Sequence, residues 1–234
     1  MAPAVSFREA VSLAGHFPVL AGLTLEVQEG EVVHLRGPNG AGKTSLLRAC
    51  AGLLPIVAGE AVVLGHDLKS DRVSVRREVA HLGHKTFLYD DLTVEENVLF
   101  AVRAAKAPTT GIEASLERVE LNGRLRATAV GRLSAGQRRR TALAVIVARR
   151  ARLWLLDEPH AGLDEVGREI LDALIAQAAS SGATVLFASH ELERAESIAS
   201  RSVEIRGGAC FTAAPPARRR RSSKNAPEVD LDVA

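Results

Sequence analysis

Residues 37–44 read Gly-Pro-Asn-Gly-Ala-Gly-Lys-Thr, which matches the phosphate-loop pattern G-x-x-x-x-G-K-[ST]. A short apolar strand is expected before it, at residues 32–35, and a helix after it, from Lys43 to about residue 51. The glycines let backbone N–H groups converge on phosphates, and the start of the helix adds positive charge. Lys43 is expected to neutralise the phosphates, and the hydroxyl of Thr44 to reach Mg²⁺. The stretch predicts a nucleotide site formed by Gly37, Pro38, Asn39, Gly40, Ala41, Gly42, Lys43, Thr44 and Ser45.

Short apolar strands alternate with helical segments downstream of this loop. Strands are expected at residues 153–156 and 184–188, with helices at 165–180 and 191–200. Continuous apolar strands between helices indicate a parallel sheet covered on both faces, so the fold class is α/β. Further strands are expected nearer the start of the chain, at residues 7–14, 20–27, 59–64 and 79–82. We expect one domain over residues 1–211, with a helical subdomain at about 84–150.

Polar residues follow two of the expected buried strands. Asp157 and Glu158 end the first, and His190 ends the second. The carboxyl ends of strands in an open α/β sheet are where ligands bind. Asp157 is therefore a candidate for the Mg²⁺ shell, Glu158 for orienting the attacking water, and His190 for contacting a γ-phosphate.

Residues 133–137 read Leu-Ser-Ala-Gly-Gln and open a long helix, in which Ser134 and Gln137 have the spacing of a capping box. Gly136 is a poor helix former, so its presence in the first turn indicates that a phosphate approaches the backbone there. The helix start would then be a second anion site. The three arginines that follow, residues 138–140, are interpreted as a solvated face.

In this order, the motifs resemble those of the ATP-binding subunits of ABC transporters, over residues 5–210. The resemblance implies a P-loop NTPase cassette with a RecA-like core, an antiparallel β subdomain and a short helical subdomain. It implies Mg²⁺-dependent ATP hydrolysis, with Glu158 as the general base and His190 on the γ-phosphate. It also implies a second cassette, forming a homodimer, in which ATP lies between residues 37–44 of one subunit and the partner's copy of Leu133, Ser134, Ala135, Gly136 and Gln137. Multi-span permease subunits would hold the dimer at the cytoplasmic face of the membrane.

Two positions depart from the usual cassette. Where the family has a glutamine, ten residues before Val94, this chain has His84, which is a further candidate for the Mg²⁺ shell. With the short helical subdomain and the Leu-Ser-Ala-Gly-Gln variant, His84 makes the chain similar to the ATPases of cytochrome c maturation haem exporters. The adenine-stacking aromatic, expected near Ala14, is missing, and Phe17 is the nearest replacement.

The composition of the chain argues against a nucleic-acid partner and against a membrane span. Of the 234 residues, the tail after residue 211 holds five basic and three acidic side chains, which leaves 25 of each elsewhere. A neutral body with 3% aromatic residues does not favour a nucleic-acid partner. No stretch predicts a membrane span, and the tail is expected to be disordered. A soluble ABC ATPase that acts in an assembly process is the alternative to the exporter subunit.

Overall fold

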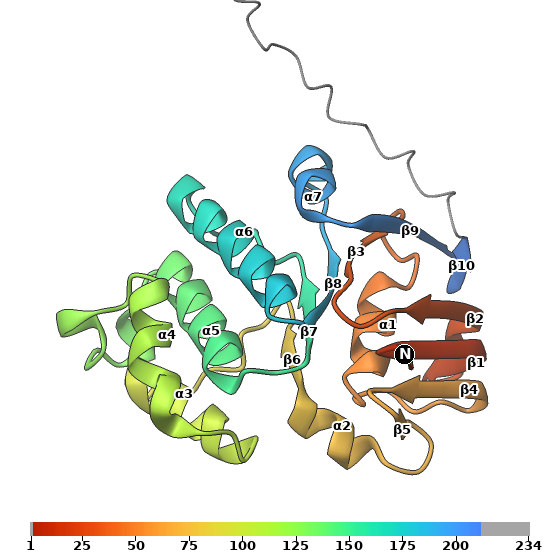
Figure 1. Ribbon diagram of the computed structural model, residues 1–234, viewed down its shortest axis with the longest axis horizontal. Coiled ribbons are helices and arrows are strands. Elements are labelled where there is room, and N and C mark those ends of the chain that lie inside the picture. The colour runs from red at the N-terminus through yellow and green to blue at the C-terminus, as the bar shows by residue number, and fades with distance from the viewer. Residues whose placement is uncertain (1, 212–234) are drawn as a thin grey trace, which may run out of the picture.

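The computed structural model describes residues 2–211, so the predicted disordered tail lies outside the described part (Figure 1). The larger sheet has the strand order β10-β9-β3-β8-β7-β6, and all its strands are parallel except β10. Its strands are β3 (Val32–Arg36), β6 (Val79–Leu82), β7 (Leu153–Asp157), β8 (Thr184–Ala188), β9 (Arg201–Arg206) and β10 (Ala209–Phe211). The expected α/β class, with a parallel sheet, is confirmed.

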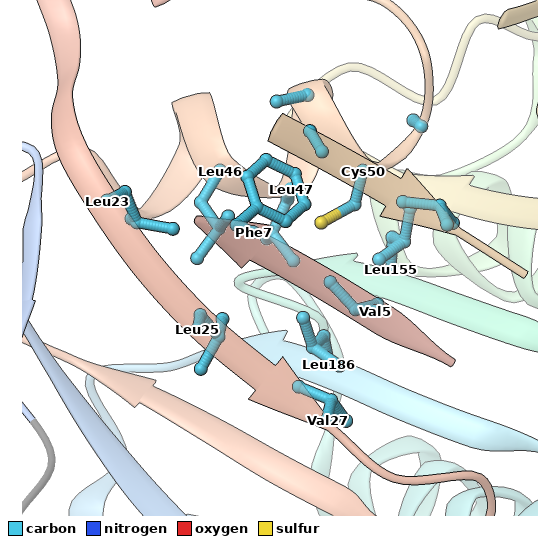
Figure 2. Close-up of a cluster of buried hydrophobic side chains, with 14 of the residues drawn as sticks. Val5, Phe7, Leu23, Leu25, Val27, Leu46, Leu47, Cys50, Leu155 and Leu186 are labelled. Atoms are coloured by element: carbon cyan, nitrogen blue, oxygen red, sulfur yellow. The ribbon is translucent and has the colours of Figure 1, made fainter. Parts of the chain in front are cut away.

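A smaller antiparallel sheet lies beside helix α1 (Lys43–Cys50). Its order is β2-β1-β4-β5. The strands are β1 (Val5–Ala14), β2 (Phe17–Val27), β4 (Ala58–Val63) and β5 (His66–Asp67). Figure 2 shows Phe7 of β1 against Leu46 and Leu47 of α1, so this sheet and the helix share one core.

Alternation along each strand divides the buried residues of the larger sheet between two cores. Leu153 and Leu155 of β7 belong to the core around α1, whereas Trp154 and Leu156 belong to the core around the other helices. Successive side chains of a strand point to opposite faces, so a strand with helices on both sides must be apolar throughout. The helices on the second face are α3 (Val94–Ala104), α4 (Ile112–Arg118), α5 (Ala135–Arg149) and α6 (Glu165–Ser180).

One α-helix and three strands were not expected from the sequence. Helix α2 (Arg72–Glu78) buries only Val75, so it lacks the apolar periodicity that marks a helix. Strand β5 has two residues, and β9 and β10 form a hairpin through Gly207 and Gly208. Helix α7 (Leu192–Ile198) is shorter than expected at both ends.

Within residues 2–211, no helix has the length and apolarity needed to span a bilayer.

Candidate active site

The phosphate loop between β3 and α1 has a backbone that only glycine allows at two positions. Gly37 has φ 140°, and a Cβ there would lie 2.1 Å from the carbonyl oxygen of Ile205. Gly42 has φ 109°, and its Cβ would lie 2.9 Å from the carbonyl oxygen of Val19. Gly42 is also the N-cap of α1 and offers no side-chain cap, so the first N–H groups of the helix remain available to an anion.

Lys43, the first residue of α1, points back over this loop. Its Nζ donates to the carbonyl oxygens of Gly37 and Pro38, at 2.6 and 3.0 Å. The side chain is buried in the loop it spans. The ammonium group therefore lies over the backbone of the loop and beside the cavity, where its positive charge suits phosphate oxygens.

Thr44 and Asp157 join the loop to the end of β7. The hydroxyl of Thr44 donates to Oδ2 of Asp157 at 2.8 Å. A hydroxyl and a carboxylate are hard oxygen donors of the kind that Mg²⁺ takes alongside nucleotide phosphates. The Mg²⁺ position stays a prediction, and no cluster of three or more carboxylate, imidazole or thiol ligands occurs within the described chain.

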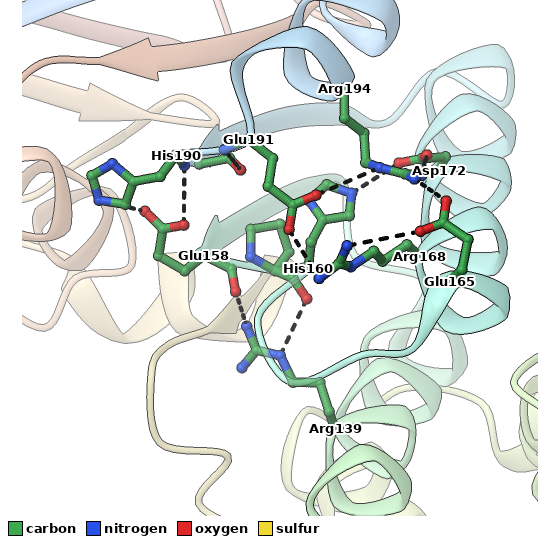
Figure 3. Close-up of polar contacts among 11 residues, drawn as sticks. Arg139, Glu158, His160, Glu165, Arg168, Asp172, His190, Glu191 and Arg194 are labelled. Carbon is green, nitrogen blue, oxygen red and sulfur yellow. Dashed lines mark hydrogen bonds and ion pairs between the residues drawn. The ribbon is translucent and has the colours of Figure 1, made fainter.

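Glu158 and His190 meet at the ends of β7 and β8 (Figure 3). Oε1 of Glu158 lies 3.2 Å from Nε2 of His190, and Oε2 accepts the backbone N–H of His190 at 3.2 Å. The backbone N–H of Glu158 donates to Ala188 in the neighbouring strand at 2.9 Å. Glu158 has φ 48°, a left-handed conformation that is rare for a residue with a side chain. Such strain is typical of functional positions.

One cavity of about 610 Å³ collects most of the predicted site residues. Its walls include the loop residues 39–45 together with His84, Asp157, Glu158 and His190. Phe17 begins β2 and is 78% exposed, next to Pro18 and Val19, which line the cavity. The sequence analysis missed the turn residues Gly207 and Gly208, which also line it. Their Gly-Gly dipeptide, after the alternating pattern of β9, is a hairpin signal that could have revealed them.

The Leu-Ser-Ala-Gly-Gln segment lies in a different place. Ser134 caps α5, and its hydroxyl accepts the N–H of Gln137 while the Gln137 side chain accepts the N–H of Ser134. Ser134, Gly136 and Gln137 line a separate hollow of about 360 Å³ with Gly162 and Asp164. Within one chain, this segment and the phosphate loop therefore do not share a cavity.

Arg138, Arg139 and Arg140 do not form the solvated face that the sequence suggested. Arg138 and Arg140 make surface ion pairs, Arg138 with Asp90 and Arg140 with Glu120 and Asp164. Arg139 instead turns inward and is 5% exposed. The helical period explains the difference, because only one of three consecutive positions can face the sheet that α5 covers.

The chain resembles known proteins in sequence and in fold. A family model described as ABC transporter matches residues 20–161. The "Cytochrome c biogenesis ATP-binding export protein CcmA" of Shewanella frigidimarina is 41% identical over 170 residues, which are 73% of this chain and 78% of that protein. The protein of the same name from Bordetella parapertussis is 43% identical over 171 residues, 72% of this chain and 75% of that protein.

Solved structures share the fold at lower sequence identity. An ATP-binding subunit of an ABC transporter superposes with a TM-score of 0.82 and 24% identity, covering 91% of this chain and 90% of that one. A dimeric ATP-binding cassette in a post-hydrolysis state with ADP and phosphate gives a TM-score of 0.79 and 24% identity, covering 90% of this chain and 98% of the other.

Proposed function

The chain belongs to the ABC transporter family, whose cassettes are ATPases, and on that basis we propose that it is the ATP-hydrolysing subunit of an exporter. The observation that carries this proposal is the single cavity that holds the phosphate loop, Asp157, Glu158 and His190. The curated relatives at about 40% identity bear the name of a cytochrome c biogenesis export protein. We propose the same role here, with haem as the exported cargo.

The residues of the cavity divide the chemistry between them. The loop N–H groups and Lys43 bind the β- and γ-phosphates, and the start of α1 adds its dipole. The carboxylate of Glu158 accepts a hydrogen bond from the attacking water and orients it, while His190 donates to the γ-phosphate. Thr44 and Asp157 would hold Mg²⁺, with His84 as a third candidate, and the ion would neutralise charge on the phosphates.

A second copy of the chain would complete the site. Ser134 and Gly136 lie at the start of α5, outside the phosphate-loop cavity of their own chain. Paired head to tail, two chains would bring this helix start of one against the nucleotide of the other, where its N–H groups suit phosphate oxygens. ATP would thereby stabilise the dimer, and hydrolysis would release it.

The membrane partner would dock beside the helical subdomain. Phe87, Tyr89 and Phe100 are large side chains that are at least half exposed there, and the rings of Tyr89 and Phe100 pack edge to face at 5.0 Å. They line a groove of about 220 Å³. Exposed aromatic side chains around a groove are typical of protein interfaces. Docking of permease subunits would hold the ATPase at the cytoplasmic face of the membrane.

Partner capture tests this proposal. A tagged Glu158→Gln chain is expressed in its native host, membranes are solubilised with MgATP, and co-purifying proteins are identified by mass spectrometry. We expect a multi-span membrane protein with Glu158→Gln, and less of it with Lys43→Ala, which lacks the phosphate-binding ammonium. Recovery of soluble partners alone, with the bait absent from membranes, would contradict the exporter role and favour the assembly ATPase.

A further inference from the structure

Arg139 on α5 makes an unusual set of contacts with the backbone around Glu158 (Figure 3). Its guanidinium donates to three consecutive carbonyl oxygens, those of Asp157 at 3.2 Å, Glu158 at 2.5 Å and Pro159 at 3.2 Å. A fourth bond, at 2.9 Å, goes to the carbonyl oxygen of Gly83, the residue before His84. One side chain therefore binds the backbone at or beside two residues that line the cavity, Glu158 and His84.

The charge of Arg139 is buried without a carboxylate in direct contact. None of the ion pairs between residues 2 and 211 includes it, and burial lowers the pKa of its guanidinium, while the charges of Asp157 and Glu158 raise it. Burying a guanidinium is unfavourable unless its N–H groups are satisfied. Here four of its five N–H groups bond to carbonyl oxygens, so the guanidinium holds those carbonyls in fixed positions.

The position that most needs such support is Glu158. Its φ of 48° is a strained conformation, and strained residues persist only where their surroundings hold them. The shortest bond of Arg139 is to the carbonyl oxygen of this residue. The opposite side of Glu158 is held by its N–H bond to Ala188. Together these two bonds fix the peptide units on either side of the Glu158 Cα, and hence the direction in which the carboxylate leaves the backbone.

Arg139 also lies two residues after Gln137, in helix α5, which Ser134 caps. We propose that Arg139 is a positioning residue that couples the start of α5 to the catalytic glutamate. The helix that meets the partner's nucleotide then sets the backbone of Glu158 in its own chain, and the Gly83 bond extends the coupling to His84. This inference rests on the proposed ATPase function and deepens it.

The test compares steady-state ATPase kinetics of the full chain with Arg139→Ala, Arg139→Lys and Arg138→Ala. Arg138 is one residue away on the same helix and pairs with Asp90 at the surface, so Arg138→Ala is the matched control. We expect Arg139→Ala to lower kcat about 100-fold, with the KM for ATP changed by no more than about twofold. Arg139→Lys keeps the charge but loses the planar arrangement of N–H donors. Its kcat is expected to lie between that of the wild type and that of Arg139→Ala. Millimolar guanidinium chloride should raise kcat of Arg139→Ala but leave Arg138→Ala unchanged.

The outcomes separate this inference from the function on which it rests. Wild-type kcat in Arg139→Ala would overturn the positioning role and leave the ATPase assignment intact. If kcat falls only in proportion to a fall in melting temperature, and guanidinium does not restore it, Arg139 has only a structural role. That result would also overturn the proposal. Should Arg139→Ala fail to fold, Arg139→Lys carries the same kcat-against-KM comparison. Wild-type chain with no Glu158-dependent hydrolysis would overturn the proposed function itself.

Discussion

Both carboxylate oxygens of Glu158 are held by one residue, His190, through its imidazole Nε2 and its backbone N–H, each at 3.2 Å. Glu158 follows β7 and His190 follows β8, so the pair joins the ends of these two strands. A substitution at either position therefore disturbs the other. For Glu158→Gln we expect kcat for ATP to fall about 10²- to 10⁴-fold, because an amide cannot act as a base.

Nucleotide affinity should survive this change, since the phosphate loop is untouched. Titration calorimetry with MgATP measures it, and coupled-enzyme kinetics measure kcat. Glu191→Gln, one residue beyond His190, is the control and should retain the wild-type rate. A Glu158→Gln chain that hydrolyses ATP at the wild-type rate would remove Glu158 from the mechanism.

Thr44→Val tests the proposed Mg²⁺ position. The change removes the hydroxyl that bonds Asp157 but keeps the side-chain volume. We expect the Mg²⁺ concentration for half-maximal ATPase activity to rise about tenfold, as expected for one lost oxygen ligand. Thr44→Ser keeps the hydroxyl and should keep the wild-type Mg²⁺ dependence. Identical Mg²⁺ titrations for Thr44→Val and wild type would contradict the assignment.

The separation of Ser134 and Gly136 from the phosphate loop predicts complementation between two inactive chains. Lys43→Ala removes one half of the site, and Gly136→Asp puts a carboxylate into the other half. Each variant alone should be inactive, but a mixed dimer retains one intact site. An equal mixture should therefore recover up to about a quarter of the wild-type rate. No recovery, with mixed dimers demonstrated by differential tags, would mean that both halves act within one chain.

Phe17→Ala tests whether this ring replaces the missing adenine-stacking aromatic. Base stacking contributes about 1–3 kcal/mol, so we expect the Kd for ATP to rise about tenfold. Phe87→Ala is the matched control, because that ring is equally exposed but lies in the docking groove. A Kd that does not change in Phe17→Ala would mean that the base is bound without this ring, and competition with GTP would then show weak base selectivity.

Stability should depend on pH through His34. This imidazole is buried on β3, stacks on Phe187 and donates from Nε2 to the carbonyl oxygen of Ser189 at 3.1 Å. Burial lowers the pKa of His34 below 6.5, with Arg36 and Lys43 acting in the same direction and Ser189 and Glu196 opposing it. The unfolded chain then binds more protons than the folded chain below that pH, so the free energy of unfolding falls as pH falls.

His34→Gln should flatten this dependence between about pH 7 and about pH 5.5. Part of the slope should remain, because burial also lowers the pKa of His81. Urea unfolding across this pH range measures the free energy of unfolding of the wild type and of His34→Gln. If the two profiles run parallel, His34 does not titrate differently in the folded and unfolded chains.

Local patterns in the sequence were enough to predict the parts of the site that lie within single motifs. Asp157, Glu158 and His190 fall at or just after strand ends, which apolar runs mark clearly, and Gly42 precedes the first turn of α1. Two features of the site could not be predicted from the sequence, because they depend on contacts between elements that are distant in the chain. The inward turn of Arg139 is set by which face of α5 meets the sheet, and the approach of Gly208 to the phosphate loop is set by a strand pairing distant in sequence.

The contact between Gly208 and the phosphate loop forms late in the synthesis of the chain. The N–H of Gly208 donates to Ala41 inside the phosphate loop at 2.8 Å, and Gly37 packs against the backbone of Ile205. After the loop has been synthesised, the ribosome must still add residues 45–208 before both contacts can form. Because chains emerge from their N-terminus, the nucleotide site is one of the last parts of the domain to assemble. A stalled chain that ends before Gly207 carries the whole phosphate-binding motif but lacks the Gly207–Gly208 turn, which lines the cavity and bonds the loop at Ala41.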